Sequence, residues 1–213
     1  MLYFDNGKTN LDYKCHHIHT EIPAPEPKRY TVEIPLRDGL LDVTGALSSF
    51  VFYGERELVF GLEMFGLRMD WPAYYSALCA DLHGKRVEIS TDEDPNYKWI
   101  GYAYVGDYED HGASAGITVT LRAEPFKRKT QKSELYYENI GGSDEITFTT
   151  TAPRTYFYFT TSEVDATVTY NGQTWTLPTG TSNGLGLVMT PGSHTLDFHG
   201  YDDLLVETEE GWL

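Results

Sequence analysis

Short runs in which apolar and polar residues alternate dominate the chain and predict a mainly β protein. In the first 125 residues these runs lie at residues 30–34, 55–62, 86–90, 98–105 and 117–123. The chain's 16 tyrosines and 10 phenylalanines favour the same structure. We expect residues 30–34 to form a half-buried strand and residues 106–116 to form the loop between the last two strands.

One helix is predicted, between Asp70 and Gly84. Asp70 is a suitable N-cap, and Pro72 fits the first turn because its missing amide hydrogen costs nothing there. Leu78 and Leu82 repeat at the four-residue spacing of a buried helix face. Gly84 can adopt the left-handed conformation that ends many helices. The first domain is therefore expected to be α+β: a β-rich domain with one short helix laid across it.

The domain division is predicted where the alternation lapses. Between residues 127 and 143 a basic run gives way to Glu-Asn-Ile-Gly-Gly-Ser, a composition that commonly separates domains. We predict an N-terminal domain over residues 1–130, a linker over 131–143 and a C-terminal domain over 144–213. The N-terminal domain begins with a polar arm that ends in three prolines within five residues, a stiff extended connector.

The C-terminal domain is predicted to be a small antiparallel β-sandwich. Asn171-Gly172 is a strong two-residue hairpin signal, and Pro191-Gly192 marks another turn. Short threonine- and aromatic-rich runs would form the strands: residues 146–151, 155–160, 166–170, 173–177, 185–190, 194–199 and 204–207.

Charge is distributed unevenly along the chain, whose formal net charge is −16. Residues 1–132 hold 15 basic and 20 acidic residues, whereas residues 133–213 hold 12 acidic residues and one basic residue, Arg154. Surfaces this acidic repel phosphate, which argues against binding to nucleic acid or to anionic membranes. The charge favours solubility, and it would also suit a channel wall that lets DNA pass without sticking.

Two features bear on the compartment in which the chain is made. No apolar run approaches the roughly 20 residues that span a bilayer, and the N-terminal residues lack the pattern of a signal peptide. Cys15 and Cys79 lie far apart, one in an extended segment and one in the predicted helix. Their placement argues against a disulfide framework and fits a reducing compartment.

Residues 112–116 match the G-x-S-x-G elbow of hydrolases, with Ser114 at the position of the nucleophile. That elbow requires a helix after the serine, whereas residues 117–121 alternate as a strand. We interpret the match as small residues in a hairpin loop. A hydrolase that uses Ser114 remains a rival hypothesis, and its minimum evidence would be an esterase activity that Ser114→Ala removes.

Two segments resemble metal sites. Cys15, His17 and His19 would share one face of a strand and could reach a single ion, but no second ligand pair follows at a zinc-like spacing. Residues 92–96 begin like a calcium loop, yet Tyr97 occupies the glycine position and Ala103 the position of the bidentate glutamate. We predict no metal ion and no cofactor.

Carbohydrate binding is the alternative function. Trp175 and Trp212 have faces on which sugar rings could stack, although in a small β-domain such residues more often serve packing. This hypothesis predicts that residues 144–213 alone bind glycans. The chain has no phosphate-binding glycine loop and no distinguishable carboxylate pair, so it is not predicted to be an enzyme.

The order of motifs from residue 35 to residue 129 resembles the N-terminal domain of distal tail proteins, the ring-forming hub of long-tailed bacteriophages. The motifs are the turn Arg-Asp-Gly-Leu-Leu-Asp at 37–42, the aromatic-rich run at 53–60, the helix end at 82–85, the acidic turn and strand at 92–101 and the exit Glu-Pro-Phe-Lys at 124–127. The C-terminal part resembles a shortened form of the family's galectin-like domain. It has no insertion of the kind that carries a carbohydrate-binding module in larger relatives.

This resemblance implies a structural protein of a siphophage or prophage tail tip, made in the cytoplasm of the bacterial host. Six copies would form a ring that joins the tail tube to tail-associated lysin or receptor-binding proteins. The N-terminal domains would surround the channel for DNA, and the C-terminal domains would point outward as docking surfaces. Another tail component, such as a tube or adaptor protein, is the structural alternative.

A ring of identical subunits requires two different complementary faces on each subunit. We expect the N-terminal arm to contribute to those faces, together with the candidate interface residues Arg37, Asp38, Gly39 and Asp42. Ordinary turn chemistry also explains these four residues.

Overall fold

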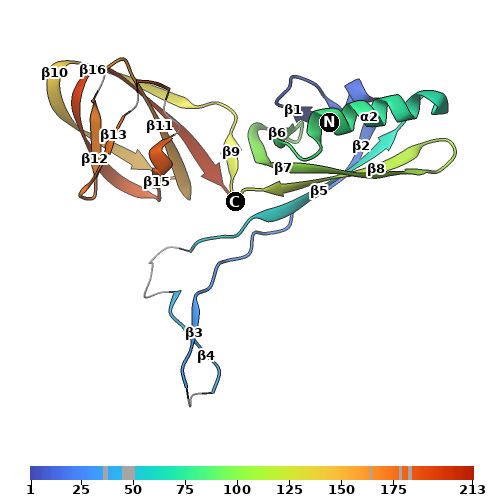
Figure 1. The fold of residues 1–213 in the computed structure, drawn as a ribbon, viewed down its shortest axis with the longest axis horizontal. Coiled ribbons are helices and arrows are strands. Elements are labelled where there is room, and N and C mark those ends of the chain that lie inside the picture. Colours follow the sequence, from blue (N-terminus) through green and yellow to red (C-terminus); the bar gives the residue numbers. More distant parts are fainter. Residues whose placement is uncertain (36–37, 45–50, 164, 178, 182–183) are drawn as a thin grey trace. The chain divides into compact units, whose positions relative to one another are not determined.

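Antiparallel strands dominate the structure, which confirms the mainly β fold class. The computed structural model describes residues 1–35, 38–44, 51–163, 165–177, 179–181 and 184–213 (Figure 1). Unit 1 comprises Met1–Pro95 and Trp99–Pro125, and unit 2 comprises Asn96–Lys98 and Phe126–Leu213. Within the described ranges no helix has the length and apolar character needed to cross a lipid bilayer.

Unit 1 is built on an antiparallel sheet in the order β1-β6-β7-β8-β5-β2. Alternation along these strands buries every second side chain, as β8 shows with Ile117, Val119 and Leu121. The strands are β1 Leu2–Phe4, β2 Cys15–Glu21, β5 Arg56–Met64, β6 Arg86–Thr91, β7 Asp94–Asp110 and β8 Ala115–Ala123.

Helix α2, Trp71–Leu82, packs on this sheet as expected (Figure 1). Leu78 and Leu82 are fully buried, and Gly84 has the predicted left-handed conformation with a φ of 73°. Asp70 precedes the helix but its side chain forms no capping hydrogen bond. The reason is that a short 3-10 helix, η2 Arg68–Asp70, leads directly into α2.

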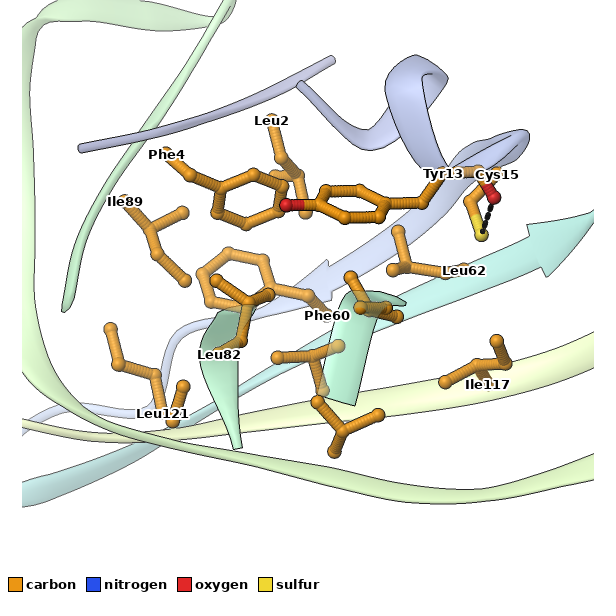
Figure 2. Close-up of a cluster of buried hydrophobic side chains, with 14 of the residues drawn as sticks. Leu2, Phe4, Tyr13, Cys15, Phe60, Leu62, Leu82, Ile89, Ile117 and Leu121 are labelled. Atoms are coloured by element: carbon orange, nitrogen blue, oxygen red, sulfur yellow. Dashed lines mark hydrogen bonds between the residues drawn. The ribbon is translucent and has the colours of Figure 1, made fainter. Parts of the chain in front are cut away.

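The core of unit 1 lies between the helix and the sheet, and distant segments of the chain meet there (Figure 2). Leu2 and Phe4 pack beside Tyr13 of the 3-10 helix η1, Asn10–Tyr13, with the rings of Phe4 and Tyr13 6.0 Å apart. Cys15 is also fully buried. Part of the segment predicted as a polar arm therefore belongs to the core, whereas Leu11, Ile18 and Ile22 of the same segment are exposed.

A two-stranded ribbon, β3 Thr31–Glu33 with β4 Leu40–Asp42, forms a sheet of its own (Figure 1). The strand predicted over residues 30–34 is thus confirmed. It is not half-buried, because every residue of β3 is exposed. The legs of the ribbon pair nearer its base, where Lys28 N donates to Phe52 O at 2.7 Å and Gly54 N donates to Glu26 O at 2.9 Å.

Unit 2 is a two-layered β-sandwich that is organised by two long strands, β10 Ser133–Thr150 and β16 Gly192–Trp212. Their pairing is interrupted by bulges between Glu138 and Ser143. On the edge away from β10, residues 197–199 of β16 pair with β12 and residues 204–211 pair with β11. Rings such as Phe148 and Phe157, 5.2 Å apart, fill the core. The remaining strands are β9 Lys127–Lys129, β11 Arg154–Thr161, β12 Thr167–Tyr170, β13 Gln173–Thr176, β14 Gly180–Thr181 and β15 Val188–Met189, with the 3-10 turn η3 Gly184–Gly186.

In unit 2 the predicted hairpin turn agrees with the structure, whereas the predicted linker does not coincide with the division between the units. Asn171 and Gly172, with φ of 51° and 78°, form the expected hairpin turn between β12 and β13. The division between the units falls at residues 125–126, whereas the sequence placed a linker over 131–143, most of which lies in β10. The pattern lapses there because β10 is an edge strand on which residues such as Leu135 and Tyr136 stay exposed.

At Gly101 in β7 the backbone of the neighbouring strand β8 leaves no room for a side chain. A Cβ atom there would lie 2.2 Å from Arg122 O and 2.7 Å from Ala123 Cα, which are backbone atoms of β8. We expect Gly101→Ala to destabilise the protein by about 2 kcal/mol or more, because the strands must separate. Urea unfolding measures this loss. Gly54→Ala is the control, since its Cβ would meet only Glu26 O at 3.8 Å.

Candidate assembly surfaces

One side of the β3–β4 ribbon carries exposed apolar side chains. Tyr30, Val32 and Ile34 alternate along β3, and Leu41 lies opposite Val32 in β4. The exposed fractions of the first three are 48%, 48% and 36%. A two-stranded ribbon gains little stability alone. We call these four residues the ribbon face, and it is a candidate contact surface.

Three of the four candidate interface residues of the sequence, Asp38, Gly39 and Asp42, lie in the described part of this ribbon. Asp38 and Gly39 are exposed just before β4, and Gly39 has a φ of 76°. Asp42 Oδ1 accepts a hydrogen bond from Thr44 N at 2.9 Å, and the hydrogen bonds to Thr44 lower the pKa of Asp42. Turn geometry therefore explains Gly39 and Asp42, while Arg37 lies outside the described residues.

Arg56 fixes the base of the ribbon to the sheet of unit 1. Its Nη1 donates to Pro23 O at 3.2 Å, and its guanidinium lies 4.0 Å from the centroid of the Trp99 ring. Burial lowers the pKa of Arg56 to about 10. No local pattern in the sequence indicates this role, because the three residues are widely separated along the chain.

Ser114 lies in a hairpin loop that is shorter than the one predicted over residues 106–116, because β7 continues to Asp110. Ser114 Oγ donates to Glu63 Oε1 at 2.6 Å, and strand β8 begins at the next residue. The helix that a nucleophile elbow places after its serine is replaced by this strand. The geometry therefore supports the interpretation as small residues in a turn.

Cys15, His17 and His19 do not converge on one point. A bulge between His17 and His19 breaks the alternation of β2, so the expectation that the three share a face is wrong. Cys15 lies in the core, where its Sγ approaches Tyr13 O at 3.4 Å (Figure 2). Within the described ranges, no three His, Cys, Asp or Glu side chains are grouped so that they could hold a metal ion.

The two thiols are expected to react at different rates. Burial raises the pKa of Cys15 to about 12, so almost no thiolate forms at this site near pH 8. Cys79 is partly exposed on α2. A chromogenic disulfide reagent should therefore titrate one thiol per native chain and two after unfolding, and Cys79→Ser should remove the native signal. Equal rapid reaction of both thiols in the native protein would contradict this prediction.

The remaining predicted motifs serve structural contacts. Asp92 Oδ1 accepts from the N-terminal amine of Met1 at 2.5 Å, and this bond lowers the pKa of Asp92 in a tight turn between β6 and β7. Trp175 is half-buried against the core of unit 2. Trp212 Nε1 donates to Glu210 Oε2 at 3.2 Å. Trp175 thus packs against the core, and Trp212 contacts a nearby carboxylate.

The acidic end of β16 lies against the basic run that begins in β9. Glu209, 2% exposed, lies 3.2 Å from Lys98 Nζ and 3.2 Å from Arg128 Nη1. Tyr158 OH also donates to Glu209 Oε2 at 2.9 Å. On either side Lys129 pairs with Glu210 and Lys132 pairs with Glu207. Part of the negative charge of the C-terminal half is therefore neutralised within unit 2.

The two units in this order have the fold of a phage distal tail protein. The crystal structure of SPP1 Dit (gp 19.1), a paradigm of the hub adsorption apparatus in phages that infect Gram-positive bacteria, matches with a TM-score of 0.59 and 15% identity over 100% of this chain and 98% of that chain. The baseplate of phage p2 in its activated conformation with Sr matches with a TM-score of 0.44 and 7% identity over 92% and 90%. No family model and no curated protein sequence matches the chain. The resemblance seen in the sequence is thus confirmed at the level of the fold.

Proposed function

We propose that the chain is a structural, non-enzymatic component of a bacteriophage or prophage tail tip. The observation that carries this proposal is the likeness to SPP1 Dit over the full length of both chains. A match that includes both units in the same order is more informative than a match to either β-rich unit alone. In this role six copies form a hub ring between the tail tube and the lysin or receptor-binding proteins, around the exit channel for DNA.

The ribbon face supplies one of the two complementary faces that ring closure needs. Tyr30, Val32 and Ile34 are exposed although they alternate like the residues of a buried strand face. A neighbouring copy of the chain would cover them. Asp38 and Gly39 at the tip, with Asp42, would then lie at the edge of the same contact, and Arg37 is a further candidate on the sequence alone. The galectin-like C-terminal unit serves as the outward docking surface in this proposal.

The first experiment is size-exclusion chromatography with light scattering, followed by negative-stain imaging of the peak. A ring of six 24.1 kDa chains has a mass of about 145 kDa and a central hole. Closed assemblies of another symmetry would favour a tube or adaptor protein.

Fluorescence anisotropy with duplex DNA at physiological salt should show no binding, because phosphate is repelled by the acidic chain. Tight DNA binding would contradict the role of an inert channel wall.

A further inference from the structure

The first half of β10, residues 133–138, has one unpaired sheet edge in unit 2. Within the described ranges β10 pairs only with β16, where Leu135 lies opposite Val206. Alternate residues of an edge strand direct their backbone N–H and C=O groups away from the sheet. The sequence Ser-Glu-Leu-Tyr-Tyr-Glu has no lysine and no proline to protect this edge, and the bulges of β10 begin only after Glu138. The edge therefore has the form of a template for one more strand.

One side of this edge is apolar. Leu135 and Tyr137 line a groove of 300 Å³ together with Phe148 from the second half of the same strand. Leu135 is 45% exposed and Tyr137 is half-buried, whereas Phe148 is 7% exposed. Successive side chains of a strand point to opposite faces of its sheet. A strand added to this edge would therefore present the side chains opposite Leu135 and Tyr137 to the same groove, and apolar side chains fit there.

The other side of the edge is acidic, because Glu134 and Glu138 are exposed there. In β16 they lie opposite Glu207 and Asp203, and like charges in directly opposite positions repel each other. Lys132 pairs with Glu207, but within the described ranges no ion pair involves Glu134 or Glu138. Basic side chains on an added strand would neutralise both glutamates.

A second copy of the chain fits this edge poorly. Antiparallel pairing of two such edges about Tyr136 would set Glu134 of each copy opposite Glu138 of the other. Residues 133–213 hold 12 acidic residues and one basic residue, so two copies of unit 2 also repel each other at longer range. The charges of the edge therefore favour a basic partner.

We propose that residues 133–138 bind an extended basic segment of another protein as an added antiparallel strand. The segment has basic residues opposite Glu134 and Glu138 and apolar residues opposite Leu135 and Tyr137. Its order is basic, apolar, any residue, apolar, basic. Backbone hydrogen bonds supply the affinity in strand addition, and the side-chain pattern supplies the specificity. In the proposed function, on which this role rests, unit 2 is the outward docking surface, and the edge defines the chemistry of what docks there.

Fluorescence anisotropy of the full chain with a labelled peptide, Thr-Lys-Val-Thr-Val-Lys-Thr with blocked ends, tests this binding. We expect saturable binding with a dissociation constant below about 1 mM. Replacing both lysines of the peptide by glutamate should weaken binding roughly tenfold or more, because attraction becomes repulsion. Methylating the backbone nitrogens of the first valine and the central threonine should weaken it as strongly. Donors alternate along a strand, so one of these two successive nitrogens must face β10.

Protein variants locate the peptide on the edge. Glu134→Lys should weaken binding of the basic peptide about fivefold. The double variant Glu134→Lys with Glu138→Lys should prefer the glutamate peptide, because the charge pattern is exchanged. Glu145→Lys is the matched control, since it makes the same charge change at an exposed position of β10 beyond the bulges. It should bind the basic peptide like the wild type, and hydrogen exchange should slow in residues 133–138 when the peptide is bound.

Three results would overturn the proposal. The first is no binding of the basic peptide up to about 1 mM. The second is equal binding of the methylated peptide, which would show that charge alone attracts it. The third is slowed exchange in residues 133–138 that grows with protein concentration without peptide, which would assign the edge to a second copy. Light scattering of the same samples reports ring assembly separately, so failure of the ring and failure of the peptide are distinguishable.

Discussion

Replacing Val32 by aspartate is expected to abolish assembly of the chain into rings while leaving each chain folded. Val32 lies at the centre of the ribbon face, between Tyr30 and Ile34 and opposite Leu41. Its side chain is 48% exposed in the single chain, so the substitution removes little intramolecular packing. In a ring the new carboxylate would be buried without a partner, which costs several kcal/mol per contact and is repeated at every interface.

Light scattering measures this outcome directly. The Val32→Asp variant should elute at the 24.1 kDa mass of one chain, whereas the wild type should elute at about 145 kDa. Leu40→Asp is the matched control, because Leu40 is 63% exposed but lies on the other side of the ribbon. It should retain the ring. Rings of normal yield from Val32→Asp, or rings lost equally in both variants, would show that the ribbon face is not the contact.

The elements that the sequence predicts well are those set by neighbouring residues. Strict alternation of apolar and polar residues predicts β8. The pair Asn171-Gly172 is nearly sufficient to predict the turn between β12 and β13, because both residues tolerate positive φ. Gly84 ends α2 for the same local reason. Such signals depend on only a few residues, so tertiary contacts change them little.

The features that the sequence misses depend on distant partners. Strand β1 forms only because Leu2 and Phe4 meet β6, and no local pattern in so short a segment announces this pairing. The ribbon shows the converse case. Its alternation is typical of a strand with one buried side, but it cannot show that this side is exposed in the described part of unit 1. Exposed strands with a buried-type pattern are therefore informative about partners.

The candidate surfaces were predictable only in part for the same reason. The turn residues at the tip of the ribbon could be found from sequence, whereas the ribbon face needed the register of β3 against β4. The separate charge counts for residues 1–132 and 133–213 also did not reveal this neutralisation of charge, because Glu209 and its partner Arg128 are 81 residues apart.

Replacing Glu209 by glutamine is expected to lower the stability of the protein by about 3–5 kcal/mol, the usual cost of removing one partner from a buried ion pair. Lys98 and Arg128 would keep their charges with side chains only 15% and 11% exposed. For a chain of this length that loss corresponds to a fall in melting temperature of about 10 °C, measured by circular dichroism at pH 7. Glu207→Gln is the control. Its partner Lys132 is 34% exposed, so the cost should stay below about 1 kcal/mol.

The pH dependence of the same variant tests the cause of its instability. Burial alone would raise the pKa of Glu209, but the charges of Lys98 and Arg128 outweigh it and hold the pKa below its ordinary value of 4.5. A carboxyl group with a lowered pKa stabilises the fold above its unfolded value, and that contribution is lost as the pH falls through the folded value. The stability difference between wild type and Glu209→Gln should therefore be full at neutral pH and shrink as the solution is acidified below 4.5. Urea unfolding at a series of pH values measures it, and a difference that stays constant into acid would show that packing, not charge, accounts for the loss.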